Sequence, residues 1–146
     1  MTKVFTSSVI DAPVGKVWHH IRDFNSLPKW MPVVKDSHIE AGLPPDQIGC
    51  IRNFNLKDGG NIREQLLTLS DLQLNFTYSI LESPMAVKNY TATVELRKVT
   101  DGDRTYIQWT AEFDTTPEEE AGLIELIGTG VFKGGLDSLK KHFSEK

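Results

Sequence analysis

Apolar and polar residues alternate with a period of two along seven stretches of the chain, which is the pattern of β-strands with one buried face. The predicted strands cover residues 3–10, 33–40, 49–56, 61–70, 73–81, 88–99 and 104–114. Short turns such as KDGG and TDGD join neighbouring strands. The last six strands therefore predict an antiparallel meander.

Helical periodicity replaces this pattern in two places. After Pro13, apolar residues follow the spacing i, i+3, i+4, i+7 of a short helix, and a second helical turn is expected at about 25–30. A long helix is expected from Thr116 as N-cap to about Phe143, with Glu119 completing a capping box. These elements predict an α+β fold: a seven-stranded antiparallel sheet wrapped around a long C-terminal helix, with two short helices after the first strand.

The apolar face of the predicted long helix carries four glycines. At 100° per residue, Ile124, Ile127 and Val131 form the centre of this face. The glycines on the same face are Gly128, Gly130, Gly134 and Gly135. Each costs about 1 kcal/mol relative to alanine, so we expect either a close approach of a strand or space for a ligand cavity.

The inner faces of the later strands are apolar, whereas three consecutive earlier strands carry an ionisable residue on the apolar phase: Lys35, Arg52 and Glu64. Unpaired burial of such groups costs several kcal/mol. An internal ion network, side chains reaching solvent at strand ends, or a β-bulge that shifts the phase would each explain a single case. The three together predict a polar cluster inside a cavity, whose unbalanced positive charge would attract a carboxylate or phenolate ligand.

Composition, charge and motif content limit the domain count, partners and cofactors to be expected of this chain. The 146 residues contain 39% hydrophobic residues and no internal repeat or linker, so residues 1–146 are expected to form a single domain. With a net charge of −4 and no basic stripe, nucleic acid is not an expected partner. One cysteine and a polar start, MTKVFTSS, predict a cytoplasmic protein without stable membrane insertion. No histidine pair has metal-ligand spacing and no nucleotide-binding fingerprint occurs, so neither metal nor cofactor is expected.

Four segments carry a resemblance to a known superfamily: DAPVGKVWHHIRDFNSLPKW, IGCIRNF, TYIQWTAEFDTTPEEE and the long final helix. The chain resembles START and birch-pollen-allergen (SRPBCC) proteins, in particular bacterial members of the polyketide cyclase/dehydrase and lipid transport family. The resemblance covers nearly the whole chain and implies the helix-grip fold.

A more distant similarity is to the plant abscisic acid receptors, through IGCIR and the NY of SPMAVKNY. It implies that Lys35 stands where the receptor lysine meets the hormone carboxylate, and that Glu64 and Tyr90 belong to a polar water network. The receptor gate loop Ser-Gly-Leu-Pro is KDGG here, the latch arginine is replaced by an apolar residue, and Trp109 replaces an acidic residue. Gated hormone signalling is therefore not implied.

Two functions follow as alternatives. The favoured one is a carrier or sensor that binds a hydrophobic small molecule with an acidic group. The other is a cyclase or dehydratase in which Glu64 and Tyr90 act as acid and base while Arg52 or Lys35 stabilises an enolate. Binding is favoured because no pocket histidine is evident and nearby cations would lower the pKa of Glu64. A protein-interaction module, a third option, would need a large exposed apolar patch.

The predicted ligand-binding residues are Lys35, Arg52, Phe54, Glu64, Phe76, Tyr78, Tyr90, Trp109, Ile127, Val131 and Gly135. Successive turns of a meander lie at opposite ends of the sheet, so loops 57–60 and 83–87 should share an end with the start of the final helix. We expect these loops at the cavity mouth, either as a mobile lid or as ordinary hairpin turns.

Overall fold

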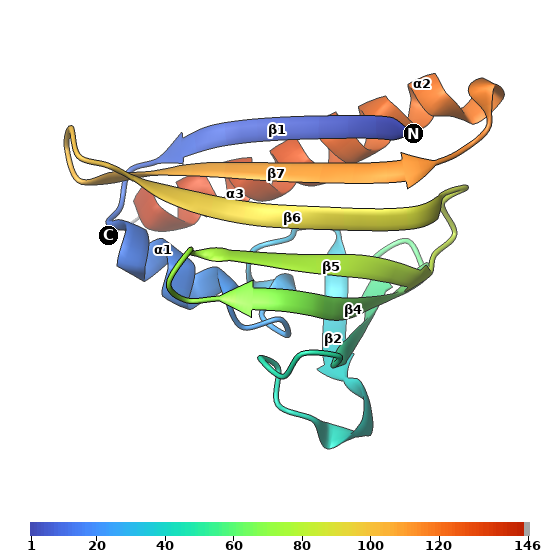
Figure 1. Ribbon diagram of the computed structural model, residues 1–146, viewed down its shortest axis with the longest axis horizontal. Helices are drawn as coiled ribbons and strands as arrows, with labels where there is room; N and C mark the ends of the chain where they lie inside the picture. Colours follow the sequence, from blue (N-terminus) through green and yellow to red (C-terminus); the bar gives the residue numbers. More distant parts are fainter. Residues whose placement is uncertain (145–146) are drawn as a thin grey trace.

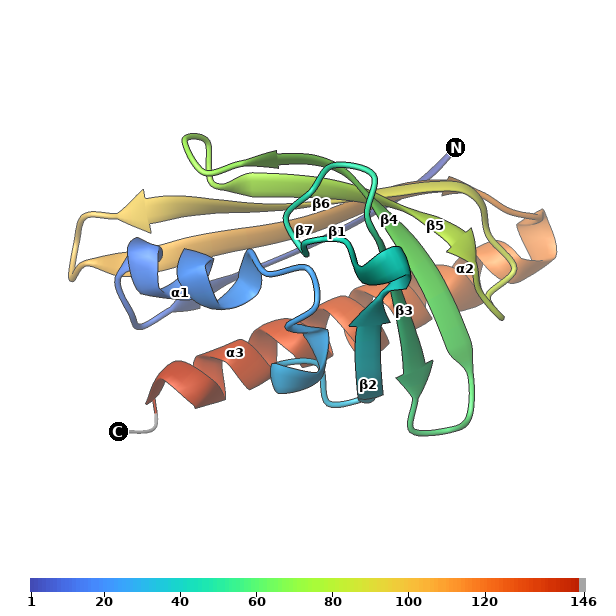
Figure 2. The same ribbon diagram turned by 90° about the horizontal axis from the view of Figure 1, so that it is seen from below.

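The computed structural model describes residues 1–144, and in it a curved antiparallel sheet holds a long C-terminal helix against its concave face (Figures 1 and 2). The strands are β1 Thr2–Ile10, β2 Val34–Ile39, β3 Ile51–Leu56, β4 Asn61–Ser70, β5 Asn75–Glu82, β6 Lys88–Val99 and β7 Arg104–Asp114. The helical elements are α1 Val14–Ile21, the 3-10 turns η1 Leu27–Lys29 and η2 Glu40–Gly42, α2 Pro117–Glu125, the π-helix η3 Leu126–Lys133, and α3 Gly134–Ser144.

The strand order β1-β7-β6-β5-β4-β3-β2 confirms the predicted meander and the α+β helix-grip class. Strands β2 to β6 each pair with the next along the chain, while β1 pairs antiparallel with β7 from Thr2↔Phe113 to Ile10↔Thr105. Of the two short helices expected after the first strand, one is α1 and the other is the 3-10 turn η1.

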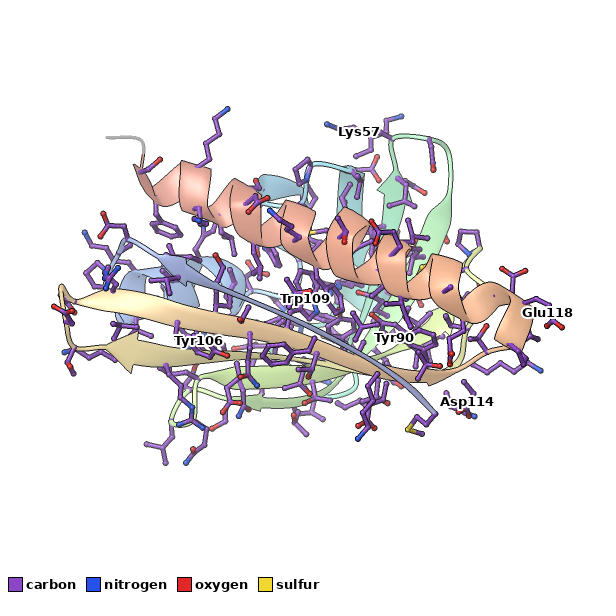
Figure 3. All side chains as sticks on the ribbon, turned by 90° about the horizontal axis from the view of Figure 1, so that it is seen from above. Lys57, Tyr90, Tyr106, Trp109, Asp114 and Glu118 are labelled. Carbon is purple, nitrogen blue, oxygen red and sulfur yellow. The ribbon has the colours of Figure 1, made fainter. Side chains whose placement is uncertain are left out.

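The alternation of the later strands places their apolar residues on the concave face, as predicted. Phe76 and Tyr78 on β5, Tyr90 on β6, and Trp109 on β7 are each less than 5% exposed. Figure 3 shows Tyr90 and Trp109 between the helix and the sheet. This apolar wall is the part of the core against which the helix packs.

The prediction that Lys35 faces inward is wrong, because β2 contains a β-bulge. Val34 pairs with Leu56, and the next pair along the strand is Asp36 with Asn55, so Lys35 is the extra residue. The bulge lets Val34 face the core at 4% exposure while Lys35 is exposed. Alternation counted back from Ile39 therefore assigns Lys35 to the wrong face of the sheet.

The C-terminal helix also differs from its prediction. It is helical from Pro117 to Ser144, but the stretch Leu126–Lys133 is a π-helix. Thr116 is the N-cap residue, yet its side chain makes no capping hydrogen bond, so the expected capping box is not formed. Ile124, predicted at the centre of the apolar face, is 41% exposed, and Leu123 is buried in its place.

Glycine allows the helix to lie close to β1. A Cβ atom at Gly128 would stand 3.2 Å from Val4 Cγ1, and Thr6 Oγ1 donates a hydrogen bond of 3.2 Å to the Gly128 carbonyl. Close approach of a strand, one of the two explanations that the sequence left open, thus applies to Gly128.

Candidate functional site

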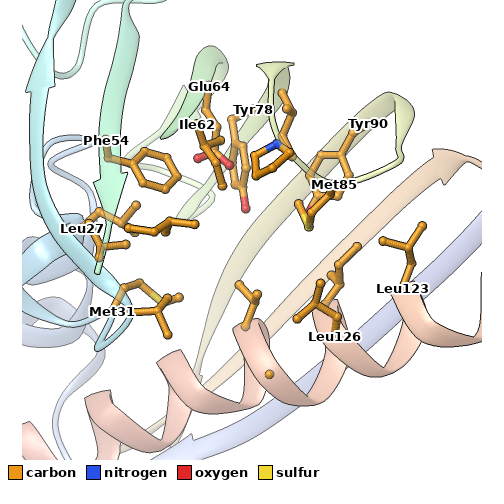
Figure 4. Close-up of a pocket in the computed structure, with 18 of the residues that line it drawn as sticks. Leu27, Met31, Phe54, Ile62, Glu64, Tyr78, Met85, Tyr90, Leu123 and Leu126 are labelled. Carbon is orange, nitrogen blue, oxygen red and sulfur yellow. The ribbon is translucent and has the colours of Figure 1, made fainter. Parts of the chain in front are cut away.

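A cavity of about 680 Å³ lies between the concave face of the sheet and the C-terminal helix (Figure 4). Its sheet wall comes from the inward phases of six strands, with Val34, Phe54, Ile62, Tyr78, Tyr90 and Trp109. The helix contributes Leu123, Leu126, Ile127, Gly130 and Val131. The volume falls in the range of small-molecule sites, and the wall is predominantly apolar with few polar groups.

A buried ion pair forms the polar part of the cavity wall. Arg52 on β3 and Glu64 on β4 are directly opposite each other in the strand register. Arg52 Nε and Nη2 both contact Glu64 Oε1, at 2.7 Å and 2.6 Å. The two residues are 3% and 6% exposed. Burial raises the pKa of the Glu64 carboxyl, and the adjacent Arg52 guanidinium opposes that rise.

The remaining surface of the Arg52 guanidinium is covered by protein. Its Nη1 donates a 3.2 Å hydrogen bond to the Phe24 carbonyl. Its Cζ lies 3.9 Å from the centre of the Phe24 ring and 4.9 Å from that of Tyr78. Hydrogen bonds and aromatic contacts together hold the cation in place.

Aromatic contacts fix the tyrosines beside the ion pair. Trp109 Nε1 donates a 3.0 Å hydrogen bond to the Tyr78 hydroxyl, and Tyr90 packs beside Tyr78 with ring centroids 6.4 Å apart. Phe132 stacks on Trp109 at 4.2 Å. Burial raises the pKa of both Tyr78 and Tyr90, with the Glu64 charge acting in the same direction, so both phenols stay protonated at neutral pH.

Most of the predicted set comes together around this cavity. The residues that line it are Arg52, Phe54, Glu64, Tyr78, Tyr90, Trp109, Ile127 and Val131. Lys35 does not line it, because the bulge in β2 turns its side chain to solvent. The polar cluster inferred from three charges therefore contains two of them.

Phe76 and Gly135 also lie outside the cavity lining. Phe76 is buried farther along β5, where its ring packs against Trp18 and Phe24. Gly135 is buried against side chains: a Cβ atom there would clash with Met31 Sδ and would stand 3.1 Å from Trp109 Cζ3. Gly135 thus allows close packing, and Gly130 is the helix glycine that borders the cavity.

The segment that precedes β2 contributes cavity residues that were not predicted from the sequence. Leu27 of the turn η1 and Met31 just after it line the cavity, and the Phe24 carbonyl accepts a hydrogen bond from Arg52. The apolar residues of NSLPKWMPVV were a signal that this segment returns to the core, but the sequence carried no sign of which side chain would meet the cavity.

The cavity opens at the end of the sheet predicted from strand alternation. Asp58 of the β3–β4 loop, Met85 of the β5–β6 loop and Glu119 of α2 belong to its lining. A Cβ atom at Gly60 would lie 3.7 Å from Pro84 Cγ, so the two loops adjoin. Figure 3 shows Lys57 at the tip of the β3–β4 hairpin and Glu118 at the start of the C-terminal helix. Whether the loops move stays a prediction.

A second hollow of about 540 Å³ adjoins the mouth, where β5 and β6 diverge. Their pairing runs from Asn75↔Glu95 to Ser79↔Thr91 and does not continue beyond. Ile80 and Tyr90 border both spaces.

In the described part of the chain, no group of three or more His, Cys, Asp or Glu residues is placed to hold a metal ion.

A curved sheet closed by a C-terminal helix over an apolar cavity defines a helix-grip protein of the SRPBCC class. The family model described as polyketide cyclase/dehydrase and lipid transport matches residues 1–144, so the chain belongs to that family. None of the curated proteins matches the chain significantly.

Solved structures from bacteria share the whole fold. The protein XoxI from Bacillus cereus is 30% identical, with a TM-score of 0.89 over 99% of this chain and 97% of that one. A protein from Bacillus thuringiensis is 29% identical, with a TM-score of 0.88 over 99% and 100% of the two chains. A solution structure from Thermobifida fusca is 28% identical, with a TM-score of 0.89 over 99% and 94%.

Family membership indicates binding of a small hydrophobic ligand. Within residues 1–144, no helix combines the length and the apolar character needed to cross a membrane.

Proposed function

We propose that the protein is a carrier or sensor that binds a hydrophobic small molecule in the cavity between sheet and helix. The observation that carries this proposal is a space of about 680 Å³ with a mostly apolar wall and one internally paired charge cluster. A ligand there would contact the aromatic residues Phe54, Tyr78 and Trp109 on one side and Ile127 on the other. Burial of its apolar surface supplies the affinity.

An enzyme of the cyclase or dehydratase type is the alternative, with Glu64 and the tyrosines as proton-transfer groups. Burial favours it by raising the pKa of the Glu64 carboxyl, as a general acid requires, but the Arg52 guanidinium in contact with that carboxylate opposes the rise. The observed hydrogen bonds favour binding, because these groups already have protein partners. Arg52 donates to Glu64 Oε1, and Trp109 Nε1 donates to the Tyr78 hydroxyl. The raised pKa values of both tyrosines also exclude a phenolate base at neutral pH.

Filling the cavity tests this proposal. We expect the uncharged fluorescent probe N-phenyl-1-naphthylamine to bind one molecule per chain, and Val131→Trp to weaken its binding at least tenfold. Val131 is half-buried and lines the cavity, so the indole would take up ligand space. Fluorescence titration measures both affinities, and thermal unfolding confirms that the variant folds.

Thr129→Trp is the matched control, because Thr129 is exposed on the same π-helix and does not line the cavity. It should bind the probe as the parent protein does. Absence of binding to the parent protein, or equal binding by the two variants, would refute the cavity as the ligand site.

We further propose that the loops 57–60 and 83–87 close over the ligand. Met85 and Pro84 line the cavity from one loop and Asp58 from the other, while Gly59, at φ +97°, adopts a backbone conformation that glycine favours. Hydrogen exchange should slow in both loops together when the naphthylamine probe binds. Exchange that stays unchanged in both loops would identify them as ordinary hairpin turns.

A further inference from the structure

The charged groups within the cavity wall already balance each other. Among the described lining residues, Arg52 is the only Lys or Arg; the carboxylates are Glu64, in contact with it, and Asp58 and Glu119 at the mouth. The pair Arg52–Glu64 carries no net charge. The exposed position of Lys35 removes the unbalanced cation from which an acidic ligand was inferred.

An anionic ligand would have to displace protein contacts from Arg52. Two of its nitrogens contact Glu64 Oε1, at 2.6–2.7 Å, and a third donates to the Phe24 carbonyl. The rings of Phe24 and Tyr78 also pack against the guanidinium. A bound carboxylate would leave a net negative charge in an apolar space, and a bound ammonium would leave a net positive one. Either ion loses its hydration without gaining a free counter-charge.

Glu64 supplies a hydrogen-bond acceptor in the cavity wall. Both guanidinium contacts go to its Oε1, and within the described residues no hydrogen bond is made to Oε2. The residue is 6% exposed and its carboxyl group faces the cavity in Figure 4. Because guanidinium stays protonated at all relevant pH values, the contact keeps the carboxylate ionised, and an ionised carboxylate only accepts hydrogen bonds.

We propose that the cavity selects an uncharged hydrophobic ligand that donates a hydrogen bond, from a hydroxyl or an amide N–H, to Glu64 Oε2. This inference rests on the proposed binding function and replaces the acidic ligand expected from the sequence. The hydroxyl of Tyr90 lies in the same wall and is neutral, because burial raises its pKa.

Head-group selectivity tests the proposal, with ligands that share one ten-carbon chain. Decan-1-ol, decanoate, decylammonium and 1-methoxydecane would each be titrated at pH 7.5 against bound N-phenyl-1-naphthylamine. We expect decan-1-ol to compete at least tenfold better than either ion. It should also compete several-fold better than 1-methoxydecane, which accepts but does not donate a hydrogen bond.

Removing either charge of the ion pair should change this ranking, and the two variants should change it in opposite directions. Glu64→Gln keeps the shape of the side chain but leaves Arg52 unpaired, so decanoate should gain at least tenfold in affinity. Arg52→Gln leaves Glu64 unpaired, so decylammonium should gain instead. Asp101→Asn is the control, because Asp101 is exposed in the β6–β7 turn and does not line the cavity, and it should leave the ranking unchanged.

The ranking in the parent protein decides the proposal even if a variant does not fold. Decanoate competing as well as decan-1-ol would overturn the neutral ligand while leaving the binding function intact. The same conclusion follows if a folded Glu64→Gln keeps the parental ranking. Failure of the probe and of all four decyl compounds to bind would instead refute the binding function itself.

Discussion

Replacing Gly135 by leucine is expected to lower the free energy of unfolding by about 3 kcal/mol or more. Already the first side-chain atom would clash with Met31 Sδ and would stand 3.1 Å from Trp109 Cζ3 and 3.2 Å from Trp30 Cζ3. The two indole rings are rigid and packed at 5.5 Å from each other, so the helix would have to move away from the sheet. Urea unfolding of the variant measures the loss.

Gly134→Ala provides the control for this substitution. No atom lies within 4 Å of a Cβ atom at Gly134, so the better helix propensity of alanine should stabilise the protein by about 0.5–1 kcal/mol. A Gly135→Leu variant as stable as the parent, but with weakened binding of the naphthylamine probe, would contradict close packing. It would show that Gly135 provides cavity volume.

The fold could be predicted from the sequence because its signals are local. Period-two alternation located all seven strands, and the turn KDGG aligned β3 with β4 so that Arg52 faces Glu64. Side chains on one face of paired strands are placed by the register. The ion pair was therefore within reach of sequence reasoning, since its two members share a face and a hairpin.

The errors arose where regular geometry is interrupted. One extra residue in β2 moves Lys35 from the inner to the outer phase, and an alternating pattern does not reveal which residue bulges. In the C-terminal helix, the π-helix beginning at Leu126 breaks the 100° rule used for the apolar face. Leu123 is consequently buried where Ile124 was expected. Both interruptions depend on tertiary packing rather than on local propensity.

The cavity itself was predicted partly for the wrong reason. The helix glycines were expected to allow either close packing or a cavity; Gly128 and Gly135 lie against Val4 and Met31, and Gly130 borders the cavity. The space comes instead from the separation of the curved sheet and the helix near its N-terminal half, where Leu123 and Ile127 form one wall. Long-range curvature of a sheet cannot be read from the pattern of a single strand.

The second large effect is expected at the buried ion pair. Arg52→Met should lower the free energy of unfolding by about 3–5 kcal/mol, because it leaves the Glu64 carboxylate buried without its two donors. Methionine keeps part of the contact with the Phe24 ring, so the loss reports mainly on the charge. Urea unfolding at pH 7.5 measures it.

Replacing both members of the pair should restore most of this loss. In Arg52→Met/Glu64→Leu no charge remains at the pair, and the apolar side chains lie beside Phe54 and Ile62, the pair two positions along on the same face. Buried ion pairs exchanged for apolar groups of similar volume are often neutral or stabilising by about 1–4 kcal/mol. The double variant should therefore be several kcal/mol more stable than Arg52→Met alone, a coupling that a double-mutant cycle quantifies. A loss below about 1 kcal/mol in Arg52→Met would contradict the argument, because it would mean that Glu64 is solvated from the cavity when Arg52 is absent.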